Sequence, residues 1–308
     1  MKKVILDCDV GVDDALALIL AFHSPELEVR AVTGVSGNVP VDRVFENIQR
    51  VLSLIRPNSR PFIARGAEGP LKGKAVYAHS FHGKDGLGEA TILREEKEDP
   101  WKAFSGRADE LIVEMARQDP EGMTLIATGP LTNVALALQR DPEGMKGLRE
   151  VVIMGGAVRS GGNITPFAEF NFFVDPLAAK IVLESGLPII LVPLDATHQV
   201  FLTSEVIEEK VNPIQTRFSA FVVEATGFHS IRRRFRPEAE VFYLHDPLAV
   251  GVAIRPDLVR RERLALRVET GEGERYGQVT EAGEGPKIEV CLGVDAKEFL
   301  ELFISRLS

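Results

Sequence analysis

Cysteine, tryptophan and long apolar runs are scarce in this 308-residue sequence. The two cysteines, Cys8 and Cys291, lie far apart without metal-ligand spacing, so they give no disulfide framework and fit a reducing cytoplasm. No apolar run approaches the roughly 20 residues that cross a bilayer. The apolar segment at the start, residues 4–6, is too short for a signal peptide. We therefore expect a cytoplasmic protein that does not enter a membrane.

Excess positive charge is also lacking, since the net charge is −9 and the pI about 5.3. Nucleic-acid binding needs a basic surface, so nucleic acid is not expected as a partner. The run Arg232-Arg233-Arg234-Phe235-Arg236 is, in an acidic chain, typical of a solvated helix end. The glycine-rich loop at 155–162 lacks the Gly-Lys-Ser/Thr ending of a phosphate-binding loop. This composition favours an enzyme that acts on small neutral substrates.

Strand-like apolar runs alternate with helical patterns along the chain. This alternation predicts right-handed crossovers and a mostly parallel sheet. Residues 66–100 show little periodicity, and a loop of that length in a compact domain is usually functional or mobile. From residue 264 onward, hairpin-like spacing predicts an antiparallel portion. We expect an α/β fold, with a single domain over 1–308 and a mixed central sheet flanked by helices.

One short acidic stretch organises this pattern. Asp7, Asp9, Asp13 and Asp14 place four carboxylates within eight residues, between an apolar strand at 4–6 and a helix from Ala15. Parallel sheets bind ligands at the carboxyl ends of their strands. Crowded carboxylates repel one another, and a hard divalent cation would offset that repulsion. The alternative is that one of these aspartates simply caps the helix.

Other polar stretches follow predicted strands, at residues 36–38, 128–133 and 154–171. A further one, His245-Asp246-Pro247, precedes a helix, where Asp246 could be a plain N-cap. Residues 167–173 alternate polar and aromatic side chains, which indicates a strand with Glu169 and Asn171 on one face. That face could point to solvent or into a pocket.

Together these residues resemble the inosine–uridine-preferring nucleoside hydrolase family. Its opening motif, Asp-x-Asp-x-Gly-x-Asp-Asp-Ala, matches residues 7–15, although Val10 stands where proline is usual. The resemblance runs nearly end to end and is weakest over residues 200–240. The further matches are Gly37-Asn38, residues 128–133, Met154-Gly155-Gly156, Asn163, Glu169-Phe170-Asn171, His245-Asp246-Pro247 and Gly277-Gln278-Val279.

This resemblance implies a Rossmann-like fold and a calcium-dependent N-ribohydrolase that takes part in nucleoside salvage or catabolism. The implied calcium ligands are Asp9, Asp14, Asp246 and the backbone carbonyl of Thr128. Asp9 resembles the general base that acts on a water held by the metal, and Asp7 resembles a support for the turn. A homo-oligomer is implied, with a tetramer favoured over a dimer.

The implied substrate is a small-molecule nucleoside, and its ribose and base contacts follow residue by residue. The matches are Asp13 and Asn171 for the 2′ and 3′ hydroxyls, Asn163, Glu169 and His82 near the 5′ hydroxyl, and Asn38 and Met154 along the sugar pocket. His245 matches the histidine that serves the departing base, a role suited to a side chain that titrates near neutral pH. Its presence favours a substrate range that is not strictly purine.

The base-facing residues stay open at this point. The segment from Phe228 to Tyr243 offers His229, Phe235 and Tyr243 as candidates. Two alternatives for the whole chain also stay open. Asp7-Cys8-Asp9 fits the minimal motif of a haloacid dehalogenase-type phosphatase, and a calcium- and nucleoside-binding protein without turnover would carry the same residues.

Overall fold

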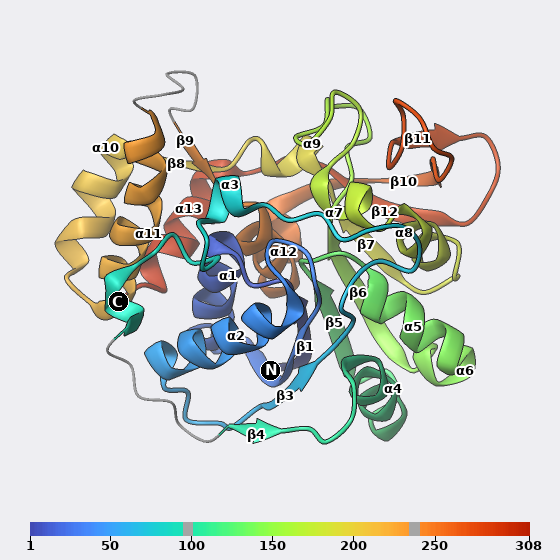
Figure 1. Cartoon of the computed structure of the whole chain (residues 1–308), viewed down its shortest axis with the longest axis horizontal. Coiled ribbons are helices and arrows are strands. Elements are labelled where there is room, and N and C mark those ends of the chain that lie inside the picture. Colours follow the sequence, from blue (N-terminus) through green and yellow to red (C-terminus); the bar gives the residue numbers. More distant parts are fainter. Residues whose placement is uncertain (95–100, 234–240) are drawn as a thin grey trace.

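A computed structural model describes residues 1–94, 101–233 and 241–308 of the chain, without the side chains of 94 and 228–233. One ten-stranded sheet with the order β11-β10-β12-β7-β6-β5-β1-β2-β3-β4 runs through the described part of the molecule (Figure 1). Its strands are β1 Lys2–Cys8, β2 Leu27–Gly34, β3 Phe62–Arg65, β4 Lys102–Ala103, β5 Met123–Ala127, β6 Leu148–Met154, β7 Ile189–Val192, β10 Val259–Val268, β11 Val279–Ala282 and β12 Lys287–Val294.

Most of this sheet is parallel. Neighbouring strands pair in parallel along the order β12-β7-β6-β5-β1-β2-β3-β4. Strand β10 pairs antiparallel with both β12 and β11. The central strands are buried on both faces, which explains why they read as continuous apolar runs and not as alternating ones. The predicted fold class, a mostly parallel mixed sheet flanked by helices, is confirmed.

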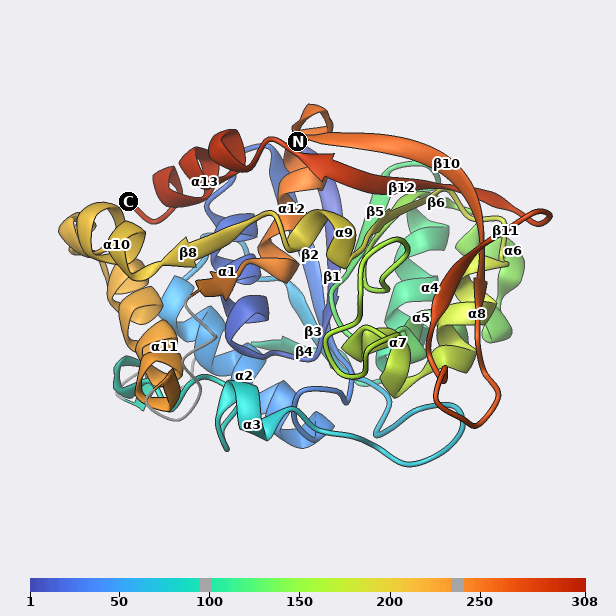
Figure 2. The same cartoon turned by 90° about the horizontal axis from the view of Figure 1, so that it is seen from above.

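Helices cover both faces of the sheet (Figure 2). One apolar cluster joins one face of the sheet to α1, α2, α11, α12 and α13, and a second joins the other face to α4, α5, α6 and α8. The helices are α1 Val12–Phe22, α2 Val41–Ile55, α3 His79–His82, α4 Ala108–Gln118, α5 Thr132–Arg140, α6 Pro142–Met145, α7 Phe170–Val174, α8 Pro176–Leu183, α9 Leu194–Thr197, α10 Ser204–Val206, α11 Arg217–Arg233, α12 His245–Ile254 and α13 Ala296–Ser305.

The strand order reverses at β1, which fixes the position of the functional site. β1 has β2 on one side and β5 on the other, so the chain switches direction across the sheet there. Asp7 at the end of β1 lies in register with Thr33 of β2 and Ala127 of β5. The loops that leave these three strands therefore begin side by side, at the kind of switch point where open α/β sheets bind ligands.

A second, two-stranded sheet escaped the sequence prediction. β8 (Phe201–Thr203) pairs antiparallel with β9 (Val241–Tyr243), with Phe201 opposite Tyr243. β8 follows α9, and β9 precedes α12. This short ribbon therefore brings the end of α9 next to the start of α12.

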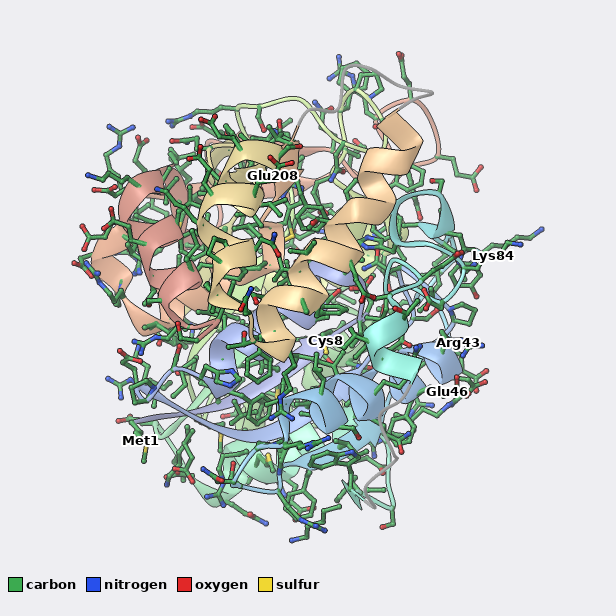
Figure 3. The ribbon with its side chains drawn as sticks, turned by 90° about the vertical axis from the view of Figure 1, so that its left-hand side faces the viewer. Met1, Cys8, Arg43, Glu46, Lys84 and Glu208 are labelled. Carbon is green, nitrogen blue, oxygen red and sulfur yellow. The ribbon has the colours of Figure 1, made fainter. Side chains whose placement is uncertain are left out.

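Figure 3 shows several charged side chains on the side of the molecule where α2 and α11 lie. Arg43, Glu46, Lys84 and Glu208 are exposed, whereas Cys8 lies inside, next to the acidic turn. None of the described helices combines the length and apolarity needed to cross a membrane. The arginine-rich run from 232 to 236 lies outside the described side chains.

The expected strand at 167–173 is wrong. Residues 170–174 form helix α7, because the Glu169 carboxylate caps it by accepting hydrogen bonds from the backbone N–H groups of Asn171 and Phe172. Glu169 and Asn171 are both buried. Of the two directions considered for these side chains, the pocket is the one observed.

Candidate functional site

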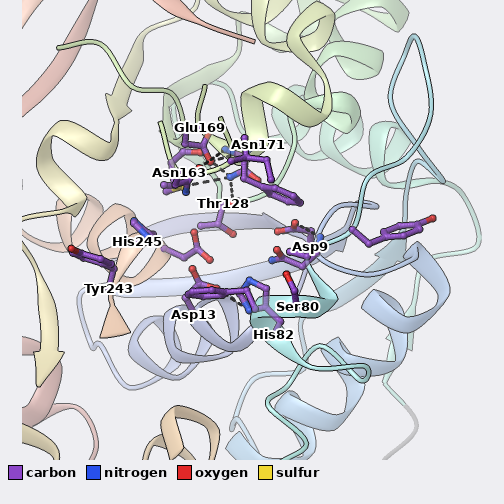
Figure 4. A pocket seen from close by; sticks show the side chains of 18 of the residues that line it. Asp9, Asp13, Ser80, His82, Thr128, Asn163, Glu169, Asn171, Tyr243 and His245 are labelled. Carbon is purple, nitrogen blue, oxygen red and sulfur yellow. Dashed lines mark hydrogen bonds and ion pairs between the residues drawn. The ribbon is translucent and has the colours of Figure 1, made fainter. Parts of the chain in front are cut away.

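A pocket of about 500 Å³ opens at the carboxyl ends of the central strands (Figure 4). This volume suits a small-molecule ligand. Of the predicted site residues, all except Asp14 line it. The lining residues include Asp9, Asp13, Asn38, Tyr77, Phe81, His82, Thr128, Met154, Asn163, Ile164, Glu169, Asn171, His198, Tyr243, His245 and Asp246.

Carboxylates from opposite ends of the sequence meet at this pocket. One oxygen each of Asp13, Asp14 and Asp246 lies within 4.8 Å of the others, although Asp246 is more than 230 positions away in sequence. Asp246 does not cap α12, since the N-cap position is Leu244 and no side-chain cap bond is present. The capping alternative for Asp246 therefore fails, and its carboxylate belongs to the acidic cluster.

Asp14 lies beneath the pocket and is fully buried. Its Oδ2 accepts the Gly11 N–H at 2.8 Å, which satisfies a donor at the start of α1, and its Oδ1 accepts the Thr128 hydroxyl at 2.8 Å. Asp14 thus has a capping role and also ties the turn after β1 to the turn after β5. The Thr128 carbonyl accepts a hydrogen bond from the Asn171 side chain at 2.7 Å.

Asp9 is held by the turn after β2. Its Oδ2 accepts the backbone N–H of Asn38 at 2.7 Å. A side chain at Gly37 would place its Cβ 2.1 Å from that same oxygen, so only glycine allows this approach. The Gly37-Asn38 pair therefore positions the Asp9 carboxylate at the pocket wall.

Burial makes this carboxylate cluster unfavourable without a counter-charge. Burial, followed by repulsion from Asp14, raises the pKa of Asp13 to about 7 and that of Asp9 well above its usual range. Burial and the neighbouring Asp13 and Asp14 carboxylates do the same to the pKa of Asp246. Among the described residues, the buried Oδ1 of Asp13 finds no hydrogen-bond partner. Clustered carboxylate oxygens with an unsatisfied member fit a hard divalent cation.

The cluster differs in one member from the predicted ligand set. It contains Asp13, which the resemblance assigns to the ribose, and it does not include Asp9. Both residues line the pocket. The division of the four aspartates between metal, water and ribose stays a prediction.

Asp7 does not line the pocket but fixes its base. Its Oδ1 accepts hydrogen bonds from the Thr33 hydroxyl at 2.6 Å and the Asn133 side chain at 2.8 Å. Asn133 also bonds the Gly34 carbonyl and the Ala67 N–H. Burial raises the pKa of Asp7 to about 7. These bonds join the ends of three strands, in line with the supporting role expected of Asp7.

The far wall, at the top of Figure 4, holds Asn163, Glu169 and Asn171. Glu169 accepts the Gly156 N–H at 2.8 Å in addition to its bonds to α7, so it joins the loop after β6 to this helix. Asn163 Oδ1 accepts the Phe170 N–H at 2.9 Å. Glu169 and Asn163 thus use several of their hydrogen bonds to hold the backbone of this wall in place.

His82 comes from α3, within the long loop predicted to be functional. Its Nδ1 accepts the Val12 N–H at 3.1 Å and lies 3.8 Å from Asp13 Oδ1. A Cβ at Gly11 would lie 2.7 Å from that Nδ1, so glycine is needed for α3 to approach the acidic turn. The loop therefore covers the pocket from the α1 side.

Another wall of the pocket is aromatic. The ring of His245 stacks on that of Tyr243, with centroids 5.4 Å apart and planes at 29°, and His198 packs near both. Burial, with a smaller contribution from His198, lowers the pKa of His245 to about 3. The expectation that His245 titrates near neutral pH is therefore wrong, because desolvation disfavours its charged form. Its assignment to the departing base stays a prediction.

Sequence reasoning missed His198 and Thr197. Both follow strand β7, whose carboxyl end lies at the same edge as the other site loops. The rule that located the other stretches would also have selected these residues. Of the base-facing candidates, Tyr243 lines the pocket, whereas the side chains of His229 and Phe235 lie outside the described residues.

Comparisons with known proteins agree with this site. The family profile described as inosine-uridine preferring nucleoside hydrolase matches residues 4–301. A pyrimidine-specific ribonucleoside hydrolase RihA of Enterobacter sp. (strain 638) is 36% identical, over 99% of this chain and 97% of its own. Among solved structures, a plant nucleoside hydrolase (TM-score 0.92, 30% identity, 99% and 98% of the two chains) and a purine-preferring ribonucleoside hydrolase from Gardnerella vaginalis (0.91, 31%, 99% and 98%) are similar.

These matches run over the whole chain and confirm the resemblance noted in the sequence. They exclude the haloacid dehalogenase-type phosphatase, and they favour an enzyme over a binding protein. The chain belongs to the inosine-uridine preferring nucleoside hydrolase family and is an N-ribohydrolase.

Proposed function

We propose that the protein is a calcium-dependent ribonucleoside hydrolase that releases ribose and free base and prefers pyrimidine nucleosides. The observation that carries this proposal is the meeting of Asp13 and Asp246 in one pocket with Asp9 and His245, with Asp14 clustered beside Asp13 and Asp246 beneath the pocket. Carboxylate and carbonyl oxygens are the ligands that Ca²⁺ takes. Asp9, Asp14, Asp246 and the Thr128 carbonyl are the proposed ligands, and Asp13 lies close enough to share in the site.

The reaction adds water across the bond between C1′ of ribose and the base nitrogen. A bound cation would orient the attacking water, lower its pKa and hold ribose hydroxyls. Asp9 takes the proton that this water loses, because it is the aspartate whose carboxylate the Asn38 N–H holds at the pocket wall. The electron pair of the breaking C1′–N bond leaves with the base. The surrounding carboxylates stabilise the positive charge that develops on the sugar.

The ribose lies between the acidic cluster and the far wall. Asp13 and the Asn171 side chain are proposed to bind the 2′ and 3′ hydroxyls, and Asn163, Glu169 and His82 are proposed to surround the 5′ hydroxyl. Asn38 and Met154 line the space between them. This arrangement orients C1′ toward the aromatic wall, where the base would lie.

The preference for pyrimidine nucleosides rests on two observations. The 36% identical RihA proteins of Enterobacter sp. and Salmonella typhimurium are named pyrimidine-specific ribonucleoside hydrolases. The base side of the pocket has His245 and Tyr243 as neighbours, so a hydrogen-bonding ring is present in addition to stacking surfaces. Stacking alone would suit a large purine, whereas a ring N–H can meet the carbonyl of a small base.

A substrate panel tests the proposal. With calcium present, we expect release of free base from uridine and cytidine at a kcat/KM at least about tenfold above that for inosine, a difference of about 1.4 kcal/mol in transition-state binding. Base release is followed by chromatography, with 2′-deoxyuridine as the matched probe of the ribose contacts. An inosine preference would overturn the pyrimidine assignment, and no base release from any nucleoside would overturn the function.

Replacing His245 with alanine is expected to lower kcat for uridine by about 10²-fold and to change KM by less than about threefold. The reason is that His245 lies on the aromatic wall, where the base is proposed to lie, and is not among the residues proposed to bind the ribose. Steady-state kinetics with the parent enzyme and the variant measure kcat and KM separately. An unchanged kcat would remove His245 from the catalytic residues.

The proposal also covers the domain organisation, assembly and location of the protein. We propose that residues 1–308 form one domain that assembles into a homo-oligomer, with a tetramer favoured, and works in nucleoside salvage in the cytoplasm. The C-terminal strands β10 and β12 join the same sheet as β1, which supports a single folding unit. The free, buried cysteines Cys8 and Cys291 are compatible with a reducing compartment.

A further inference from the structure

The aromatic wall contains a buried hydrogen bond that has no role in the reaction proposed above. The ring nitrogen Nδ1 of His245 lies 2.7 Å from the hydroxyl oxygen of Thr197. Thr197 is fully buried and does not line the pocket, whereas His245 does. Thr197 therefore acts on the pocket only through the histidine ring.

Thr197 and His245 are 48 positions apart in the sequence, and the fold brings them together. Thr197 ends α9, which follows the central strand β7, and His245 begins α12. The β8–β9 ribbon between them pairs Phe201 with Tyr243, and the Leu244 N–H continues the ribbon by bonding the Val200 carbonyl at 3.1 Å. This pairing fixes the distance between α9 and the start of α12.

The direction of the hydrogen bond follows from the donors and acceptors present. A hydroxyl has one hydrogen to donate, and a neutral imidazole has one protonated nitrogen and one acceptor nitrogen. Within the described part of the chain, no other partner is recorded for the Thr197 hydroxyl. A buried hydroxyl that fails to donate loses a hydrogen bond, so Thr197 donates and Nδ1 accepts. The ring proton is then on Nε2.

We propose that Thr197 is a positioning residue that holds His245 as the Nε2–H tautomer, with that N–H directed at the departing base. The ring is restrained twice, by the Thr197 hydroxyl at Nδ1 and by stacking on Tyr243. A ring flip would break the bond to Thr197. The preorganised N–H stabilises negative charge on the base as the C1′–N bond breaks, without a proton transfer from the ring.

This inference rests on the proposed function for the identity of the ligand, but the tautomer can be tested without it. In protein labelled with ¹⁵N-histidine, we expect long-range ¹H–¹⁵N spectra to show His245 as the Nε2–H tautomer. Thr197→Val should weaken that preference, and Thr197→Ser, which keeps the hydroxyl, should retain it. A parent His245 protonated at Nδ1 would overturn the inference even if nucleosides proved not to be substrates.

Kinetics provide the second test. Thr197→Val is expected to lower kcat for uridine about tenfold, the effect of one hydrogen bond, with Thr197→Ser close to the parent. Hydrolysis of 4-nitrophenyl riboside should change by less than about twofold, because nitrophenolate leaves without assistance. In a His245→Ala background, Thr197→Val should cause no further loss on uridine. The matched control is Thr124→Val, which removes another fully buried hydroxyl, on β5 and outside the pocket lining.

Two results would overturn the positioning role. Equal slowing of uridine and nitrophenyl riboside would indicate a general structural defect. The same loss in the presence and absence of the His245 ring would show that Thr197 does not act through it. Failure of the parent enzyme to release uracil from uridine would instead overturn the proposed function, and the tautomer measurement would still decide the role of Thr197.

Discussion

Replacing Asp9 with alanine is expected to reduce kcat for nucleoside hydrolysis by about 10³-fold, within the range typical of a lost acid–base group. Asp9 lines the pocket, and its carboxylate is held by the Asn38 N–H at 2.7 Å. The fold should survive, because burial and repulsion from Asp14 already raise the pKa of this carboxyl, so its charged form is costly in the folded protein. Kinetics with uridine and thermal unfolding measure the two effects separately.

The shape-matched variant Asp9→Asn separates chemistry from packing. Its amide oxygen can still accept the Asn38 N–H, but the side chain no longer carries a basic carboxylate. Both variants should lose activity, with melting temperatures close to that of the parent. If Asp9→Asn retained near-normal turnover, Asp9 would not be the base.

The second large effect on activity is expected when bound metal is removed. Chelation is expected to lower activity by about 10³-fold, since a metal ion contributes several kcal/mol to such a transition state, and added Ca²⁺ should restore it. Two of the proposed ligands, Asp14 and Asp246, converge with Asp13 in one buried cluster. Full activity of the chelated protein would contradict the metal role. Ca²⁺ and Mg²⁺ titrations compare the preference for the larger cation.

The stabilisation by calcium should depend on pH. The folded-state pKa values of Asp7 and Asp13 are raised from 3.8 to about 7, so between about pH 4 and 7 the metal-free folded protein binds more protons than the unfolded chain. The contribution of these groups to stability is therefore complete below pH 4 and is lost as pH rises through 7. Bound calcium would take the place of the protons on Asp13 and its neighbours in the acidic cluster, so the rise in melting temperature on calcium addition should be larger at pH 8 than at pH 5.

A carboxylate variant provides the control for this pH effect. Asp246→Asn removes one member of the acidic cluster while it keeps nearly the same shape. Calcium should then give little stabilisation at either pH. An equal calcium-induced shift at pH 5 and pH 8 in the parent would argue against binding by these carboxylates.

Much of the site was predictable because it obeys local rules. Helices α2 (Val41–Ile55) and α4 (Ala108–Gln118) are encoded locally, since their apolar side chains recur at helical spacing. The ends of parallel strands meet at one edge, so polar residues after β1, β2, β5 and β6 could be expected together. The strand predicted at residues 167–173 was wrong for a local reason as well. The Glu169 carboxylate caps helix α7, and this capping outweighs the alternating pattern of polar and aromatic residues.

The aromatic wall could not be predicted in the same way. His198 and Tyr243 meet because β8 pairs with β9, and each strand has only three residues, too few for a period-2 signal. The direction of the pKa shift at His245 depends on burial by residues from several elements, which no local pattern reports. Its expected titration near neutral pH therefore could not be checked without the tertiary structure.

The sequence by itself determined that this chain is an α/β nucleoside hydrolase with an acidic site at the end of β1, because the motif, the residue types and the alternation of strands with helices can be read from local sequence. Only the tertiary structure decided that Asp13 joins Asp14 and Asp246 in one cluster, and that the buried ring of His245 is bonded to Thr197. Those outcomes depend on distance and desolvation between segments far apart in the chain, and packing alone sets both.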